Sequence, residues 1–254
     1  MSMSRAGAGD AAGIGPGLVA RVETDGWSVA GGVLAPDAVA ALGGLFADPA
    51  DLSDSTGEAV RRSAGARNAL WTDPRLANLA SDRAVLDLVE PVLGPGARAV
   101  RVILFDKTPA ANWGVAWHQD QNIAVAARHD VPGFGPWTVK AGVHHVVPPA
   151  AVLEAMLTIR LHLDDCGPDN GPLMVLPGTH RAGLLRESDI ERLAAETAPE
   201  TCHAPAGGAI VMRPLLIHAS RPAATPGHRR VIHIEYAAAG APLPPSLAWQ
   251  GGYW

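Results

Sequence analysis

Residues 156–163, which read Met-Leu-Thr-Ile-Arg-Leu-His-Leu, are the stretch of sequence that decides the fold. Apolar and polar side chains alternate from residue 157 onward, and this alternation is the pattern of a β-strand with two unlike faces. One face is wholly apolar and suits a protein core. Thr158, Arg160 and His162 share the other face. A strand with one apolar face and one polar face indicates a β-barrel whose solvent-accessible opening carries the functional site.

The sequence on either side of this strand predicts further strands and a helical flank. Strands are predicted at residues 101–105, 209–212 and 229–236, and helical spacing of apolar residues appears at 36–46. Ser81 is placed to cap a helix that continues to residue 93 and ends at Gly94. Residues 188–191 have the pattern of a capping box that opens another short helix.

These elements predict one mainly β domain with flanking helices. We expect a flexible tail at residues 1–18, followed by a single domain at 19–254. Within that domain, the helical flank is expected to cover about residues 19–97 and the barrel about residues 98–240.

The segment Trp117-His118-Gln119-Asp120 carries the most specific chemical signal. Residues two apart on a strand point to the same face, so His118 and Asp120 can reach one ion while Gln119 points away. A His-x-Asp pair alone is weak evidence in a chain with ten His. His218, from a distant strand, completes the set of two His and one carboxylate that holds Fe(II) with open positions on one side. We therefore predict that these three residues are the metal ligands and form the catalytic centre.

Arg229 follows His218 at the start of a predicted strand. Its planar guanidinium can pair with a carboxylate through two parallel hydrogen bonds, so we predict that it anchors a dicarboxylate co-substrate. Ser220 shares the strand face of His218 and can donate its hydroxyl to the same carboxylate. Thr158 is a weaker candidate for a similar role.

Three segments resemble the motifs of a known family. Residues 117–120 are similar to its Trp-His-Gln-Asp metal motif, and residues 170–180 to its Asn-Gly-Pro-Leu and Pro-Gly-Ser/Thr-His segments. His218 and Arg229 are similar to its second metal His and its oxoglutarate anchor. The family is the phytanoyl-CoA dioxygenase-like Fe(II)/2-oxoglutarate oxygenases, which include the ectoine hydroxylases.

This resemblance covers roughly residues 60–240. It implies a double-stranded β-helix, a cupin-like jelly-roll barrel, with iron at one mouth. It also implies Fe(II) as the cofactor and 2-oxoglutarate and O2 as co-substrates.

The activity implied is hydroxylation of an unactivated C–H bond in a small metabolite or biosynthetic intermediate, with release of succinate and CO2. Asp120 favours hydroxylation, because relatives that halogenate carry Gly or Ala at this position. Demethylation, desaturation and cyclisation use the same oxidative chemistry and remain alternatives. Two rivals are a non-catalytic jelly-roll binding protein and a cupin-type metal-dependent isomerase. The complete ligand set and Arg229 argue against the first, and Arg229 with the Asn-Gly-Pro-Leu motif against the second.

Four side chains are candidates for the substrate pocket. Arg160 lies centrally on its polar strand face, and burying an unpaired guanidinium is costly. We expect it to pair with a substrate anion, with oxoglutarate, or with a nearby acid such as Asp120. Trp113, Trp137 and Lys140 are the other candidates, and each could instead be a packed loop residue or a solvated Lys.

Residues 126–149 form a long segment, rich in Gly and Pro, that follows the metal motif. Loops of this length are usually functional or disordered, and Phe134 and Trp137 favour order here. We expect an active-site cover that orders when substrate and oxoglutarate bind. The alternative is a loop that is permanently packed on the barrel.

Composition limits the partners. The net charge of −5 and the lack of a basic block with interleaved aromatics argue against nucleic acid. No apolar run is long enough to span a bilayer, and the N-terminus does not resemble a signal peptide. The two Cys, Cys166 and Cys202, fit buried thiols in a reducing compartment. We expect a cytoplasmic enzyme without a membrane partner, acting on a small molecule as a monomer or homodimer.

Overall fold

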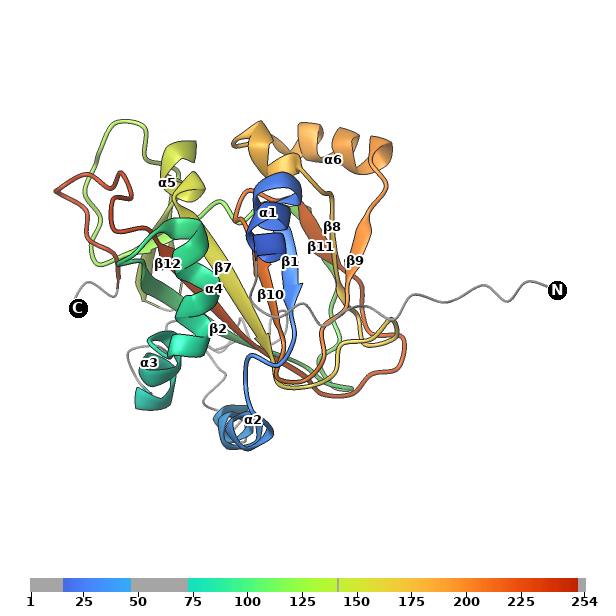
Figure 1. Ribbon diagram of the computed structural model, residues 1–254. Helices are drawn as coiled ribbons and strands as arrows, with labels where there is room; N and C mark the ends of the chain where they lie inside the picture. Colours follow the sequence, from blue (N-terminus) through green and yellow to red (C-terminus); the bar gives the residue numbers. More distant parts are fainter. Residues whose placement is uncertain (1–15, 47–72, 141, 251–254) are drawn as a thin grey trace.

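The structure, a computed structural model, describes residues 16–46, 73–140 and 142–250 (Figure 1). Its largest sheet is antiparallel and has the strand order β1-β10-β7-β12-β2. These strands are β1 (Trp27–Ala30), β10 (Ala209–Met212), β7 (Met156–His162), β12 (Arg229–Ala237) and β2 (Arg98–Lys107). The strands predicted from alternation are therefore all present, and they are neighbours in one sheet.

A second sheet faces the first and has the strand order β3-β11-β8-β9. It contains β3 (Val115–His118), β11 (His218–Ser220), β8 (Leu173–Val175) and β9 (Glu200–Cys202). An apolar cluster joins the two sheets, with Ile210 and Met212 of β10 packed with Leu173 and Val175 of β8. Two packed antiparallel sheets agree with the predicted mainly β fold.

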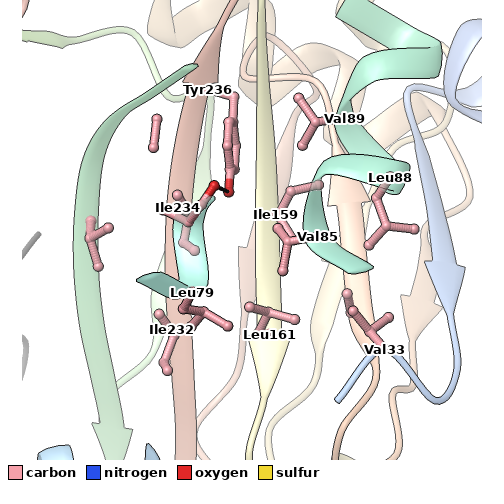
Figure 2. Packing of buried hydrophobic residues seen from close by; sticks show 14 of the residues in the cluster. Val33, Leu79, Val85, Leu88, Val89, Ile159, Leu161, Ile232, Ile234 and Tyr236 are labelled. Atoms are coloured by element: carbon pink, nitrogen blue, oxygen red, sulfur yellow. Dashed lines mark hydrogen bonds between the residues drawn. The ribbon is translucent and has the colours of Figure 1, made fainter. Parts of the chain in front are cut away.

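The helices that flank the large sheet explain its apolar face. Helices α1 (Pro16–Asp25), α3 (Pro74–Ala80) and α4 (Arg83–Leu93) lie on this face (Figure 1). Figure 2 shows Val85 and Val89 of α4 over Ile159 of β7, and the same buried cluster contains Leu88 of α4 and Ile234 of β12. These side chains belong to one buried cluster, so burial of the apolar face stabilises the sheet and its helical cover together.

The opposite face of the same sheet is polar and points into the barrel. Register places Arg160 of β7 beside His233 of β12, and Thr158 beside Glu235. All four side chains are buried. Alternation along each strand thus gives the sheet an apolar outer face and an inner face that carries charged and hydrogen-bonding groups.

Two predicted helix starts are wrong by one or two residues. Asp82, not Ser81, caps α4, because the Asp82 carboxylate accepts a hydrogen bond from the Ala84 amide at 2.8 Å. The Ser81 hydroxyl instead donates to a carbonyl at the end of α3. Helix α6 (Glu187–Glu196) already includes Ser188, so Ser188 cannot cap it, and no side-chain cap forms there.

The remaining helices are short. They are α2 (Pro36–Gly43), the 3-10 helix η1 (Gly44–Phe46), α5 (Ala150–Glu154) and the 3-10 helix η4 (Thr179–Ala182). Within the described residues, no helix combines the length and apolar character needed to cross a membrane.

The predicted cover at residues 126–149 contains a β-hairpin. Strands β5 (Trp137–Lys140) and β6 (Val143–Val146) join β4 (Ile123–Val125) in a third sheet of order β4-β6-β5. Phe134 and Trp137 pack against a buried cluster that includes Ile123 and Val146. This aromatic pair therefore anchors the segment to the protein core, in contrast to the expectation that it closes over the pocket.

The predicted N-terminal tail is too long by three residues. Helix α1 begins at Pro16, and Leu18 is 3% exposed within the main core cluster. The rest of the predicted tail, residues 1–15, lies outside the described residues.

Candidate active site

His118, Asp120 and His218 meet where two strands of the second sheet lie side by side. His118 ends β3, His218 begins β11, and register places the two residues directly opposite each other. The Asp120 carboxylate oxygens lie 3.8 Å from Nε2 of His118 and 3.7 Å from Nε2 of His218. One ligand atom from each residue lies within 4.8 Å of the other two. The structure thus brings the three predicted ligands together.

Hydrogen bonds orient both imidazoles toward this point. Nδ1 of His118 lies 2.8 Å from the Ala116 carbonyl, and Nδ1 of His218 lies 2.9 Å from the Leu216 carbonyl. Each Nδ1–H donates to its carbonyl, which leaves the Nε2 lone pair for a metal. Burial lowers the pKa of His218 to about 3, so this imidazole is neutral at physiological pH.

The Asp120 carboxylate completes a donor set that fits a divalent metal. Its Oδ2 atom is buried and has no hydrogen-bond partner among the described residues. Burial opposes its ionisation, but His218 and His118 more than offset that effect and hold the pKa of Asp120 well below its usual range. A carboxylate with an unpartnered oxygen beside two imidazoles is the ligand chemistry of a ferrous facial triad.

Gln119 fixes the segment between the first two ligands. Its side-chain amide donates to the Leu215 carbonyl at 2.8 Å and to the Gly183 carbonyl at 2.9 Å. Its oxygen accepts from the Leu185 amide at 3.0 Å and from the Gln121 side chain at 3.2 Å. The amide therefore ties the metal motif to the chain just before His218.

Two buried cations lie together at the other end of the site. Arg229 is 5% exposed and Lys107 is 1% exposed, and they face each other across β12 and β2. The Arg229 guanidinium donates to the Gly171 carbonyl, and its Nε has no partner. Neither cation forms an ion pair with a described carboxylate. This pair fits an anionic ligand group, because unpaired buried charges are costly.

Ser220 completes this cationic end. Nζ of Lys107 lies 2.7 Å from the Arg221 carbonyl and 3.4 Å from Oγ of Ser220. Burial, reinforced by Arg229, lowers the pKa of Lys107 to about 7. Sequence reasoning missed Lys107, which belongs to no motif. Its position opposite Arg229 is set by strand register, which the sequence alone did not specify.

One cavity of about 520 Å³ connects the two ends. Arg229, Ser220 and the three candidate metal ligands line it, together with the predicted substrate residues Arg160, Trp113 and Lys140. Its wall also contains residues that sequence reasoning did not select: Arg101, Ile103, Phe105, Gln121, Asn122 and His233.

Two predicted site residues are not among those that line the cavity. Thr158 lies opposite Glu235, six residues along β12 from Arg229, which corresponds to roughly 20 Å in an extended strand. It is therefore too far away to share a carboxylate with Arg229. Trp137, on β5 of the third sheet, packs against the buried cluster that includes Ile123 and Val146.

Comparison with known proteins gives the family. Residues 22–231 match the phytanoyl-CoA dioxygenase (PhyH) family, which is most of the chain. The chain belongs to this family. The predicted resemblance is confirmed, and the match extends nearer to the N-terminus than the motifs do. The family model is that of a dioxygenase, and the triad is a ligand set that suits iron.

A curated relative is the ectoine dioxygenase of Sphingopyxis alaskensis. It is 28% identical over 172 residues, which cover 65% of this chain and 49% of that protein. The matched part of this chain thus spans about half the length of its curated relative.

Solved structures confirm the predicted cupin-like jelly-roll fold. AviO1 from Streptomyces viridochromogenes Tue57 superposes with a TM-score of 0.63 at 26% identity, covering 90% of this chain and 97% of AviO1. EctD from S. alaskensis, solved with 2-oxoglutarate and 5-hydroxyectoine, gives a TM-score of 0.68 at 22% identity, with 94% and 81% covered. EctD has also been solved with bound Fe.

Proposed function

We propose that this protein uses Fe(II), 2-oxoglutarate and O2 to hydroxylate an unactivated C–H bond of a small molecule, with release of succinate and CO2. The observation that carries the proposal is the arrangement of one cavity. A three-ligand metal site lies at one position on its wall, and Arg229 lies at another, with the buried cation Lys107 opposite it on β2. A metal ion needs the first feature, and the carboxylate of a co-substrate that binds beside the metal needs the second.

In this proposal, His118, Asp120 and His218 would hold the Fe(II). The iron, when bound, supplies the O2 chemistry that attacks a C–H bond, and the protein's own residues supply position and shelter from water. The Nδ1–H bonds of the two His keep the imidazoles from rotating away from the metal. Retention of the carboxylate at Asp120 favours hydroxylation.

Arg229, Lys107 and Ser220 would hold the distal carboxylate of 2-oxoglutarate. Arg229 supplies a planar fork and Lys107 a compact charge, while Ser220 offers a hydroxyl. The Gly171 carbonyl fixes Arg229 from behind. Separate structures of EctD contain Fe and 2-oxoglutarate, which supports the same two ligands here.

We also propose a cytoplasmic enzyme that acts as a monomer or homodimer without a nucleic-acid partner. The net charge of −5 and the two buried free Cys support this proposal.

The experiment measures binding and turnover of 2-oxoglutarate in paired variants. Arg229→Gln should weaken 2-oxoglutarate binding by about 30-fold or more, because a buried charged pair is worth roughly 2 kcal/mol or more. Arg230→Gln is the matched control. Arg230 is the next residue on the strand, points away from the cavity and pairs with Asp164 at 2.6 Å.

Succinate formation tests the chemistry itself. The iron-loaded protein should convert 2-oxoglutarate to succinate, and His218→Ala should lose both this turnover and metal binding. A protein that binds neither Fe(II) nor 2-oxoglutarate would be the non-catalytic jelly-roll alternative. Equal 2-oxoglutarate affinity in Arg229→Gln and Arg230→Gln would remove Arg229 from its proposed role.

A further inference from the structure

We propose that the substrate of this enzyme carries a carboxylate and that Arg160 binds it. This inference rests on the proposed function and names the substrate class of the same site. It follows from the position of Arg160, from the partners it has, and from the charges that surround it.

Arg160 is a buried cation in the cavity wall without an acidic partner. It lies on β7, is 8% exposed and lines the 520 Å³ cavity. No carboxylate of a described residue lies within ion-pair distance of its guanidinium. Its NH1 group bonds to Nδ1 of His233 at 2.9 Å, and its Nε has no partner. A guanidinium has five donors, so most of its capacity is available to a ligand.

The neighbours of Arg160 hold it in place without neutralising it. Because Nδ1 of His233 accepts from Arg160, this imidazole is neutral and carries its proton on Nε2. That Nε2 faces Glu235 at 3.5 Å. Phe105 lies with its ring 5.5 Å from the Arg160 guanidinium carbon. These contacts fix the orientation of Arg160 and leave its charge unmatched.

Glu235 does not supply the missing negative charge, because it already has a cation of its own. Its carboxylate pairs with Arg101 on β2 at 2.9 Å, and both side chains are 7% exposed. A continuous series of contacts therefore links Arg160 to His233, His233 to Glu235, and Glu235 to Arg101.

The metal and 2-oxoglutarate do not need Arg160 for charge balance. Asp120 and one carboxylate of 2-oxoglutarate would together balance the charge of Fe(II), and the buried cations Arg229 and Lys107 would face the other carboxylate. Arg160 lies beside His233, four residues along β12 from Arg229, so the backbone positions of the two Arg residues are separated by roughly 13 Å along the strand. With the co-substrate in place, Arg160 still lacks a counter-charge.

The positive charge of Arg160, which has no acidic partner among the described residues, suits a singly charged, planar ligand group. A carboxylate has one charge and matches the guanidinium fork, whereas a phosphate monoester carries nearly two charges. We therefore expect the substrate carboxylate to lie between Arg160 and the metal.

The test compares acids with their neutral amides. The protein is loaded with Zn(II), which has no redox chemistry, and saturated with 2-oxoglutarate. It is then titrated by calorimetry with three pairs: acetate and acetamide, benzoate and benzamide, and cyclohexanecarboxylate and its amide. At least one acid should bind about tenfold or more tightly than its amide, since a charged hydrogen bond is worth at least about 1.5 kcal/mol. Phenyl phosphate should bind less tightly than benzoate.

Variants assign the preference to Arg160. Arg160→Gln should lose the preference for the acid and keep its affinity for 2-oxoglutarate within about threefold. Arg160→Lys, which keeps the charge and guards against misfolding of the first variant, should retain a weaker preference. Arg192→Gln removes an exposed Arg of α6 and is the matched control.

The outcomes separate this inference from the proposed function. Failure of the Zn(II)-loaded protein to bind 2-oxoglutarate would sink the proposed function itself. Normal 2-oxoglutarate binding with no preference for any acid would overturn only the carboxylate assignment. A preference that survives in Arg160→Gln, or a 2-oxoglutarate affinity that falls with it, would likewise overturn the role of Arg160.

Discussion

Gly171 shows how a single residue positions a charged side chain. Its φ is +57°, and a Cβ at this position would lie 2.7 Å from the Arg221 carbonyl oxygen and 3.0 Å from the Ala223 amide nitrogen. Its own carbonyl accepts a hydrogen bond from Arg229. The Asn-Gly-Pro-Leu motif therefore brings the backbone close to the next loop and aims Arg229 into the cavity.

We expect Gly171→Ala to weaken 2-oxoglutarate binding by about tenfold, because the added methyl group forces the loop and Arg229 apart. Gly32→Ala is the matched control, since Gly32 also has a positive φ of +66° but no atom within 4 Å of the point that a Cβ would occupy. Gly32→Ala should cost about 1 kcal/mol of folding free energy and leave the 2-oxoglutarate affinity unchanged. Equal effects of the two substitutions on 2-oxoglutarate affinity would show that backbone strain alone is responsible.

Gln119 supports the metal ligands by satisfying backbone groups on other segments. In Gln119→Glu the carboxylate cannot donate to the Gly183 and Leu215 carbonyls, which then lose a buried partner. We expect the free energy of unfolding to fall by about 2 to 4 kcal/mol and metal affinity to weaken. Urea unfolding of the metal-free variant and a metal titration measure the two effects. An unchanged unfolding midpoint would mean that water replaces these bonds.

At the scale of elements, alternation in the sequence predicted the strands well. Residues 156–163 and 229–236 have one face for the helices and one for the cavity, and both faces are where the pattern placed them. The i, i+2 spacing of His118 and Asp120 also predicted that these two residues lie on the same side of their strand. Lys107 was missed and Thr158 was misplaced for one reason. Their distances from Arg229 depend on register between strands far apart in sequence, which no local pattern encodes.

The sequence did not reveal the β5–β6 hairpin, because the aromatic residues at and before its first strand are compatible with two different roles. Phe134 and Trp137 could close over a cavity or pack on a core, and the partners that decide this lie far along the chain. Strand β6 is hydrogen-bonded on both sides, by β4 and by β5. A strand with both edges paired should stay folded without a ligand.

We therefore expect the amides of β6 to exchange slowly with deuterium in the protein free of iron and 2-oxoglutarate. Hydrogen exchange followed by mass spectrometry measures this directly, with and without ligands. If these amides exchange as fast as an unfolded chain until iron and 2-oxoglutarate are added, the segment is the ligand-ordered cover that the sequence suggested.

At the scale of the whole molecule, the polar interior makes stability depend on pH. His145 and His162 are 0% and 2% exposed, and burial lowers their pKa values to about 4 and about 3. Neither is a candidate metal ligand. In the unfolded chain, both imidazoles regain a pKa near 6.5. The unfolded state thus binds more protons than the folded state between about pH 7 and pH 4.

Stability should therefore fall as the pH decreases through 6.5, and the loss should level off only below the folded pKa values. Two such His lower the free energy of unfolding by about 2 kcal/mol between pH 7 and pH 5.5, above the range in which carboxylates begin to titrate. Urea unfolding of the metal-free protein at several pH values measures the slope. His162→Leu should reduce the loss of stability between pH 7 and pH 5.5 by about 1 kcal/mol, because an apolar residue that cannot be protonated replaces one buried imidazole. The exposed His129→Gln is the control. A slope that is identical in His162→Leu and in the native chain would mean that His162 is protonated in the folded state, and that the barrel interior admits a compensating anion or water.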